Sequence, residues 1–189
     1  IPVSFESITY FGHGPQENYT DRYKGTTVGL YRTTASDMYT PYVRPQENGH
    51  RTGTRWFAAT DVRGKGLLVV AGETVGFNAL RNSIEDFDSQ ESDKPYQWNN
   101  FSQAEIESHS DGSGRNRKPK QTHITDIVPR NYVELCIDHR QQGVGGYDSW
   151  GSRPVAEATI YSDQRYEYSF TLVPVNSAAD IDKKSKLKY

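Results

Sequence analysis

Alternating apolar and polar positions recur along the chain and predict a protein built mainly of β-strands. Between residues 131 and 140, Val133, Leu135 and Ile137 alternate with polar neighbours, which is the pattern of a strand with one buried face. The same pattern returns near the end of the chain, where every second residue from Tyr166 to Leu172 is apolar. We therefore expect one buried face on each of these two strands.

Short runs rich in β-branched and aromatic residues, separated by clusters of Gly, Pro, Asn and Asp, complete the strand prediction. One run, Leu67–Val70, is apolar on both faces and so belongs in the interior of a β-sandwich. The pattern predicts an all-β fold with strands at residues 4–11, 26–33, 53–60, 66–72, 131–140, 155–161 and 166–173.

One helix, one insertion and one tail interrupt this pattern. Ser102 and Glu105 form a capping box and predict a short helix. The segment 108–121 is polar and basic and lacks apolar side chains, so we expect a mobile surface insertion. The charged residues 176–189 are expected to fray as a C-terminal tail. Residues 1–175 are then one β-sandwich domain.

Length, charge and cysteine content exclude several classes of protein. The 189 residues suffice for one substantial domain. A formal net charge of −2 gives no general attraction to nucleic acids or membranes, and no apolar run approaches the roughly 20 residues that cross a bilayer. Because Cys136 is the single cysteine, an internal disulfide and a multi-cysteine zinc site are excluded.

The sequence Pro-Gln-Glu-Asn occurs twice and places Glu17 and Glu47 in similar loops. A retaining glycosidase uses two carboxyl groups about 5–5.5 Å apart, so this pair raises the question of catalysis. However, each glutamate has Asn and Arg neighbours that offer turn hydrogen bonds and ion pairs. Such neighbours keep a carboxylate ionised, whereas a catalytic acid must hold its proton. We therefore expect an architectural role and assign no catalytic residue to this chain.

The other polar candidates predict no metal, thiol or nucleic-acid chemistry. The five histidines lack the spacing of a transition-metal site, although an oxygen-ligated sodium, magnesium or calcium ion is left open. Cys136 has no adjacent His or Lys and is expected to be structural. The basic string Arg115, Arg117, Lys118 and Lys120 has no interleaved aromatic residues, so we interpret it as a solvated loop.

A glycine-rich loop from Gly143 to Gly151 presents Asp148, Ser149 and Trp150 between sharply turning backbone positions. An indole ring offers a flat apolar face to a sugar, and Asp and Ser bond sugar hydroxyls. Alternatively, Trp150 plugs the end of a sandwich, because tryptophan is usually well buried. The residues alone support both interpretations equally.

Three motifs in order, GPQENYTDR, DMYTPYVRPQENGHRTGTRW and VGGYDSWG, resemble the C-terminal, small-chain domain of the β-galactosidases of glycoside hydrolase family two. The resemblance covers about residues 3–174 and implies a galactose-mutarotase-like β-supersandwich. Because the family's domain starts upstream of such a segment and this chain opens at Ile1, we expect only the later portion of the sandwich. The segment 108–121 is longer and more basic than the family's pattern, which we interpret as a local insertion.

The resemblance also implies which residues touch substrate. In these enzymes the catalytic glutamates lie in a central (β/α) barrel, and the tryptophan of the matching Asp-Ser-Trp stacks on the sugar in the aglycone position. Trp150, with Asp148 and Ser149, is therefore expected to bind substrate in a chain that is inactive alone. Tyr147 stands where other members have an acidic residue, so the acceptor preference is expected to differ.

For the complete enzyme, the resemblance implies a terminal β-D-galactoside as substrate, other domains of a parent protein, a homo-oligomer, and a cytoplasmic or periplasmic location in a bacterium. It implies no cofactor in this chain, with magnesium and sodium bound elsewhere in the enzyme. Two other functions stay open: a free-standing carbohydrate-binding or mutarotase-like module, and a sandwich that only stabilises oligomer contacts.

Overall fold

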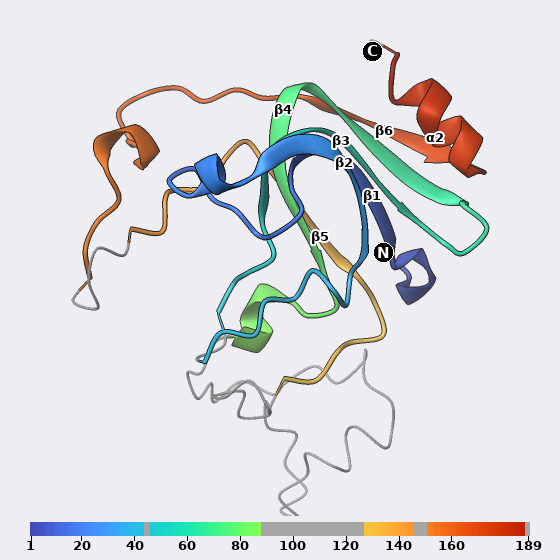
Figure 1. Cartoon of the computed structure of the whole chain (residues 1–189), viewed down its shortest axis with the longest axis horizontal. Coiled ribbons are helices and arrows are strands. Elements are labelled where there is room, and N and C mark those ends of the chain that lie inside the picture. Colours follow the sequence, from blue (N-terminus) through green and yellow to red (C-terminus); the bar gives the residue numbers. More distant parts are fainter. Residues whose placement is uncertain (44–45, 88–126, 146–150, 188–189) are drawn as a thin grey trace, which may run out of the picture.

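A computed structural model describes residues 1–43, 46–87, 127–145 and 151–187. Within these ranges six strands form one antiparallel sheet (Figure 1). The predicted all-β class is confirmed, and the architecture is consistent with a β-sandwich domain. The strands are β1 (Ser7–Gly14), β2 (Thr27–Thr34), β3 (Arg51–Thr60), β4 (Gly66–Leu80), β5 (Glu134–Asp138) and β6 (Phe170–Val175).

The long strand β4 organises the sheet. The strand order is β2-β1-β3-β4, and β4 then pairs with β6 along its first half and with β5 along its second half. β4 extends to Leu80, eight residues beyond the predicted end at Gly72, and every residue from Val75 to Leu80 is buried. The register between β3 and β4 is irregular around Thr54.

The sheet buries apolar side chains on both faces. Phe57 and Val69 belong to the larger core, in which the rings of Phe57 and Phe77 stack with centroids 4.1 Å apart. Their sequence neighbours Ala58 and Leu68 point to the opposite face and a smaller core. The prediction that Leu67–Val70 packs in the interior on both of its faces is thus confirmed.

The strand expected around Val133 is confirmed, with Val133 fully buried and Leu135 and Ile137 packed against the larger core. The strand expected at 155–161 is wrong. Ala156–Ala158 form a 3-10 turn instead, since two alanines and a glutamate favour a pleated strand only weakly.

The buried face expected between Tyr166 and Leu172 is also wrong. Strand β6 begins only at Phe170, and the apolar Phe170 and Leu172 are exposed. Val173 and Val175 are the buried residues. The physical reason is that only one face of β6 is covered: Val173 and Val175 pack in the smaller core, whereas Phe170 and Leu172 alternate onto the opposite, uncovered face.

Fraying of the C-terminal tail stays a prediction, but the described part of the tail contains a helix. Ala178–Lys184 form the helix α2, which begins where the Ser177 side chain accepts a hydrogen bond from the backbone N–H of Asp180. Ile181 is buried in the smaller core. A single apolar residue and a capping serine therefore suffice to dock this charged segment on the sheet.

In Figure 1 the turn Ala156–Ala158 and the chain around it lie at one end of the sheet, away from α2 and the turn between β3 and β4. This end carries the segments that lead into and out of the glycine-rich loop. The helix predicted at Ser102 and the insertion 108–121 lie outside the described residues. No helix in the described ranges is long and apolar enough to cross a membrane.

Candidate functional site

The predicted substrate-binding residues, Asp148, Ser149 and Trp150, lie outside the described residues. The structure does describe both segments that flank them, residues 139–145 and 151–153. We define the loop base as residues 139–145 and 151–158, the two segments on either side of the glycine-rich loop. The candidate site described below consists of this loop base and the residues that form hydrogen bonds to it.

The first Pro-Gln-Glu-Asn loop holds the loop base through two hydrogen bonds. The carboxylate of Asp21 accepts a bond from the backbone N–H of Gly145 at 2.8 Å. The hydroxyl of Thr20 donates to the backbone carbonyl of Gln141 at 3.0 Å. Thr20 and Asp21 lie two and three residues after Asn18 in the sequence, so the repeat and the loop base form one connected structure.

Gly145 is required by the geometry of the loop base. Its φ of +70° is a left-handed conformation that favours glycine. A Cβ at this position would lie 2.3 Å from the backbone oxygen of Ser152. The entering and leaving segments therefore meet at Gly145, immediately outside the undescribed residues 146–150.

The second Pro-Gln-Glu-Asn loop holds the same base from another direction. The side-chain amide of Gln141 donates to the carboxylate of Glu47 at 2.7 Å and to that of Asp138 at 3.2 Å. Asp138 ends β5, so the sheet, the repeat and the loop base share this amide. Gln141 and Glu47 are 94 residues apart in the sequence.

The two repeats adopt the same local turn. The side-chain amide of Asn18 donates to the carbonyl of Gln16 at 3.0 Å, and that of Asn48 donates to the carbonyl of Gln46 at 2.9 Å. Both asparagines are buried, each with 1% of its surface exposed. The repeat in sequence is therefore also a repeat in structure, because each Asn side chain closes the turn that precedes it.

The repeats also bind each other. The backbone N–H of Asn18 donates to the carbonyl of His50 at 2.9 Å, and the N–H of Gly49 donates to the carboxylate of Glu17 at 2.6 Å. Glu17 further accepts a hydrogen bond from the Tyr42 hydroxyl. Both glutamates of the repeats thus hold neighbouring loops. These structural contacts account for the two glutamates without a catalytic role.

Burial sets the electrostatics beneath the loop base. Burial and the adjacent Arg51 lower the pKa of His50 to about 4, and its ring stacks on Tyr19 with centroids 5.4 Å apart. Burial raises the pKa of Asp138, and the neighbouring Glu47 adds to this, whereas the Gln141 hydrogen bond opposes it. The ring of His50 is therefore neutral at neutral pH.

The sequence alone does not mark Thr20, Asp21 or Gln141 as supports of the loop base. Nothing local marks them, because the partners of Asp21 and Thr20 are more than 120 residues away. The meeting of His13, His50 and His139 around one cleft was likewise missed. Within the described ranges, no three His, Cys, Asp or Glu side chains gather in a way that would hold a metal ion. Cys136 is half-buried on β5.

Comparison with known proteins identifies the family. The family model for the β-galactosidase small chain matches residues 1–172. A β-galactosidase of Priestia megaterium is 32% identical over 173 residues, which are 92% of this chain and 14% of the relative. The β-galactosidases of Streptococcus thermophilus and Vibrio cholerae are 28% and 30% identical over 93% and 91% of the chain, and over 14% and 13% of their own lengths.

The chain thus spans about one seventh of the length of these curated relatives, at 14% of the first of them. The family match extends over β1 to β5, the start of β6, both Pro-Gln-Glu-Asn loops and the glycine-rich loop. The chain therefore belongs to the β-galactosidase small-chain family.

Proposed function

We propose that this chain is the small-chain domain of a β-galactosidase that hydrolyses terminal β-D-galactosides. In this proposal Trp150, with Asp148 and Ser149, contacts the aglycone side of the active site. The catalytic glutamates belong to a barrel domain of the parent enzyme, outside this chain. Magnesium and sodium ions are assigned to those other parts as well, and the parent enzyme forms a homo-oligomer.

One observation carries the proposal: the base of the glycine-rich loop is fixed from two directions. Asp21 holds the N–H of Gly145, and Glu47 holds the side chain of Gln141. Two separate loops that converge on one short segment favour a fixed position for that segment. Holding a loop in its binding conformation before the ligand arrives lowers the entropy cost of binding.

The chemistry of the three loop residues suits a sugar more than a bond-breaking step. An indole ring contributes stacking area, while a carboxylate and a hydroxyl exchange hydrogen bonds with sugar hydroxyls. None of these interactions depends on charge that develops during cleavage. We therefore assign Trp150 to binding of the leaving group or the acceptor, and expect it to affect affinity more than the chemical step.

The test is the kinetics of Trp150→Ala in the full-length enzyme, with Trp150→Phe as the matched variant that keeps an aromatic ring. We expect Trp150→Ala to weaken apparent substrate or acceptor affinity by about 1–3 kcal/mol with a smaller change in kcat. Trp150→Phe should retain most of the affinity. A Trp150→Ala enzyme with normal affinity and clearly reduced stability would assign the indole to the core and defeat the proposal.

The chain alone is expected to hydrolyse no chromogenic β-galactoside above background. A competing function, a free-standing carbohydrate-binding or mutarotase-like module, makes a different prediction. It requires sugar binding or anomer interconversion by the chain without any partner domain. Assay of the chain alone for hydrolysis and for mutarotation separates the two functions.

A further inference from the structure

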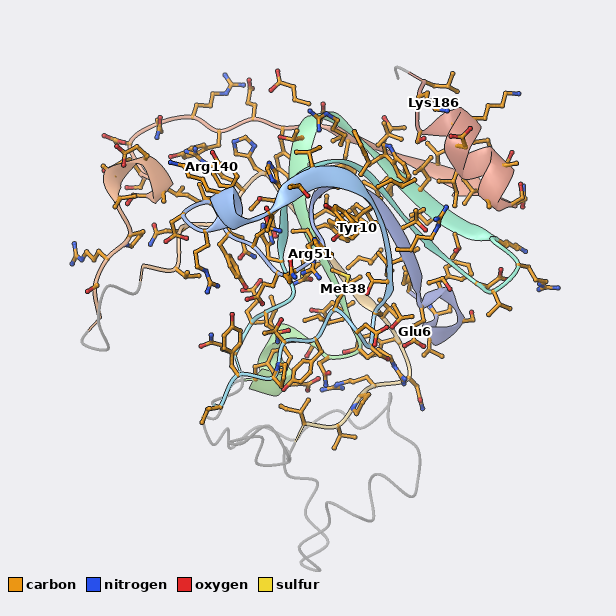
Figure 2. The ribbon with its side chains drawn as sticks, in the orientation of Figure 1. Glu6, Tyr10, Met38, Arg51, Arg140 and Lys186 are labelled. Atoms are coloured by element: carbon orange, nitrogen blue, oxygen red, sulfur yellow. The ribbon has the colours of Figure 1, made fainter. Side chains whose placement is uncertain are left out.

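A cleft of about 450 Å³ lies between β1, β2, the first Pro-Gln-Glu-Asn loop and the segment that follows β2, and we call it the arginine cleft. Arg51, the first residue of β3, forms part of its wall. In Figure 2 the labelled Tyr10, Met38 and Arg51, which all line this cleft, lie close together inside the curve of the sheet. The cleft is large enough to hold an amino-acid side chain.

Arg51 is a buried cation with an unused edge. Only 4% of its surface is exposed. Its Nε donates to the Tyr10 hydroxyl at 3.2 Å, and its Nη1 donates to the carbonyls of Gly49 and His50 at 2.9 and 3.3 Å. The third nitrogen, Nη2, has no hydrogen-bond partner among the described residues. Unlike the ring nitrogens of His50, Nη2 retains contact with solvent, so a group that enters the cleft can reach it.

The charge of Arg51 also lacks a partner of opposite sign. Its three hydrogen bonds all end on neutral oxygens, and it forms no ion pair with a described residue. Glu17 lines the cleft too, but its carboxylate already pairs with Arg22 at 3.5 Å and accepts two further hydrogen bonds. Arg32 and Asp37, the other charged residues of the lining, are exposed and of opposite sign. The positive charge of Arg51 therefore stays uncompensated, which is costly for a buried group.

We propose that the arginine cleft receives a carboxylate, and that this carboxylate belongs to an aspartate or glutamate side chain from another part of the parent enzyme. The planar edge of a guanidinium group matches a carboxylate in geometry, and hydrogen bonds between these charged groups are stronger than those between neutral groups. Thr40 also lines the cleft and offers a hydroxyl donor. A carboxylate at Nη2 would satisfy the free donors and the charge of Arg51 together.

A tethered side chain fits the arginine cleft better than a free small carboxylate does. One guanidinium edge supplies only a few hydrogen bonds, whereas a free molecule must offset the loss of its translational and rotational freedom. A side chain of the same polypeptide is already held near the cleft at a high effective concentration. The chain spans 14% of a β-galactosidase relative, so an enzyme of that length has ample further sequence. The proposal rests on the chain being one domain of a larger enzyme, and it is independent of the role of Trp150.

A crystal structure of the full-length enzyme, grown without carboxylates or other oxyanions in the buffer, tests the proposal directly. We expect a carboxylate oxygen from a residue outside this chain within about 3.2 Å of Nη2 of Arg51. Water alone, a neutral carbonyl or a free anion at Nη2 would overturn the proposal. An empty cleft in a multidomain enzyme overturns this proposal alone, whereas a parent protein without further domains overturns the proposed function as well.

A double-mutant cycle then measures whether the contact stabilises the enzyme. The acidic residue found in the crystal structure is changed to its amide, alone and together with Arg51→Met, and the rate of thermal inactivation is measured. We expect the double variant to inactivate at least about threefold more slowly than the product of the two single effects predicts, because the two groups share one charged hydrogen bond. The matched cycle with Arg22→Met, whose guanidinium already pairs with Glu17, should show no coupling.

Equal coupling in the two cycles, or none in either, would overturn the proposal. If Arg51→Met fails to fold, the amide variant alone decides. It should inactivate at least about threefold faster than the unaltered enzyme, since a charged hydrogen bond has become a neutral one. An unchanged rate of inactivation in the amide variant would show that the carboxylate does not stabilise the enzyme through Arg51 and would overturn the proposal.

Discussion

The carboxylate of Asp21 accepts a hydrogen bond from the backbone N–H of Gly145 at 2.8 Å, across 124 residues of sequence. This contact joins a loop that contains one copy of Pro-Gln-Glu-Asn to the entrance of the glycine-rich loop. The second copy reaches the same loop base through Glu47 and Gln141. The repeated motif therefore acts as a support for the segment that carries the predicted sugar contacts.

The buried asparagines of the two repeats should be important for stability. Asn18→Ala leaves the carbonyls of His13 and Gln16 and the N–H of Thr52 without their partner. An unpaired buried group costs about 1–3 kcal/mol, so we expect Asn18→Ala to lower the free energy of unfolding by about 2–4 kcal/mol. Urea unfolding measures this loss. Gln16→Ala, at an exposed neighbour, should stay within about 0.5 kcal/mol, and an equal loss in both variants would contradict the role of Asn18.

The two glutamates of the repeats should be dispensable for bond cleavage. Glu17→Gln and Glu47→Gln keep an oxygen acceptor for the N–H of Gly49 and the amide of Gln141. We expect kcat of the full-length enzyme to stay within about tenfold in both variants, whereas loss of a catalytic acid or base costs about 10²–10⁴-fold. A loss of that larger size in a variant of normal stability would make the glutamate catalytic.

Acid should destabilise the protein through His50. Its pKa is about 4 when folded and 6.5 when unfolded, so between these values only the unfolded state binds the proton. Stability therefore falls as the pH falls from 6.5 to about 4, by on the order of 3 kcal/mol. The raised pKa of Asp138 acts with the opposite sign, because the folded state then keeps its proton to higher pH.

The variant His50→Leu isolates this contribution. The difference in the free energy of unfolding between pH 7 and pH 4.5 should be smaller in His50→Leu than in the unaltered protein, whatever the absolute stability of the variant. Equal pH dependence in the two proteins would show that His50 does not titrate as its burial implies.

The helix α2 should contribute to stability through one side chain. Ile181→Ala removes a buried residue of the smaller core, and we expect a loss of about 2 kcal/mol, the lower end for such truncations. Lys183→Ala, on the exposed side of α2, is the matched control and should change little. Thermal or urea unfolding compares them, and equal small effects would mean that α2 frays in solution.

The alternation of apolar and polar residues predicted the strands correctly where the apolar side chains of the pattern enter the cores. It succeeded around Val133 and at Leu67–Val70, where the alternation of side chains matches the two cores. It failed at Phe170 and Leu172, because the same alternation is compatible with an edge strand whose apolar face is left open. It failed again at Ile181, where one apolar residue among charges gives too weak a pattern.

Only those residues of the candidate site that short sequence motifs identify could be predicted. The resemblance singled out Trp150, and the acidic and basic neighbours of Glu17 and Glu47 indicated an architectural role. The supports of the loop base, Asp21 and Gln141, were not predictable, because their partners are brought together only by the folded sheet. For the same reason, the sequence did not predict that His13, His50 and His139 lie around one cleft.

The measurement that tests the central claim most directly is a double-mutant cycle between Asp21→Ala and Trp150→Ala in the full-length enzyme, read as apparent acceptor affinity. If Asp21 acts by positioning the loop that carries Trp150, each single variant weakens affinity and the double variant is little worse than Trp150→Ala alone. Asp21→Asn, which keeps an oxygen acceptor for the N–H of Gly145, should retain most of the affinity. Losses from Asp21→Ala and Trp150→Ala that add to within about 0.3–0.5 kcal/mol would show two independent sites and contradict the account.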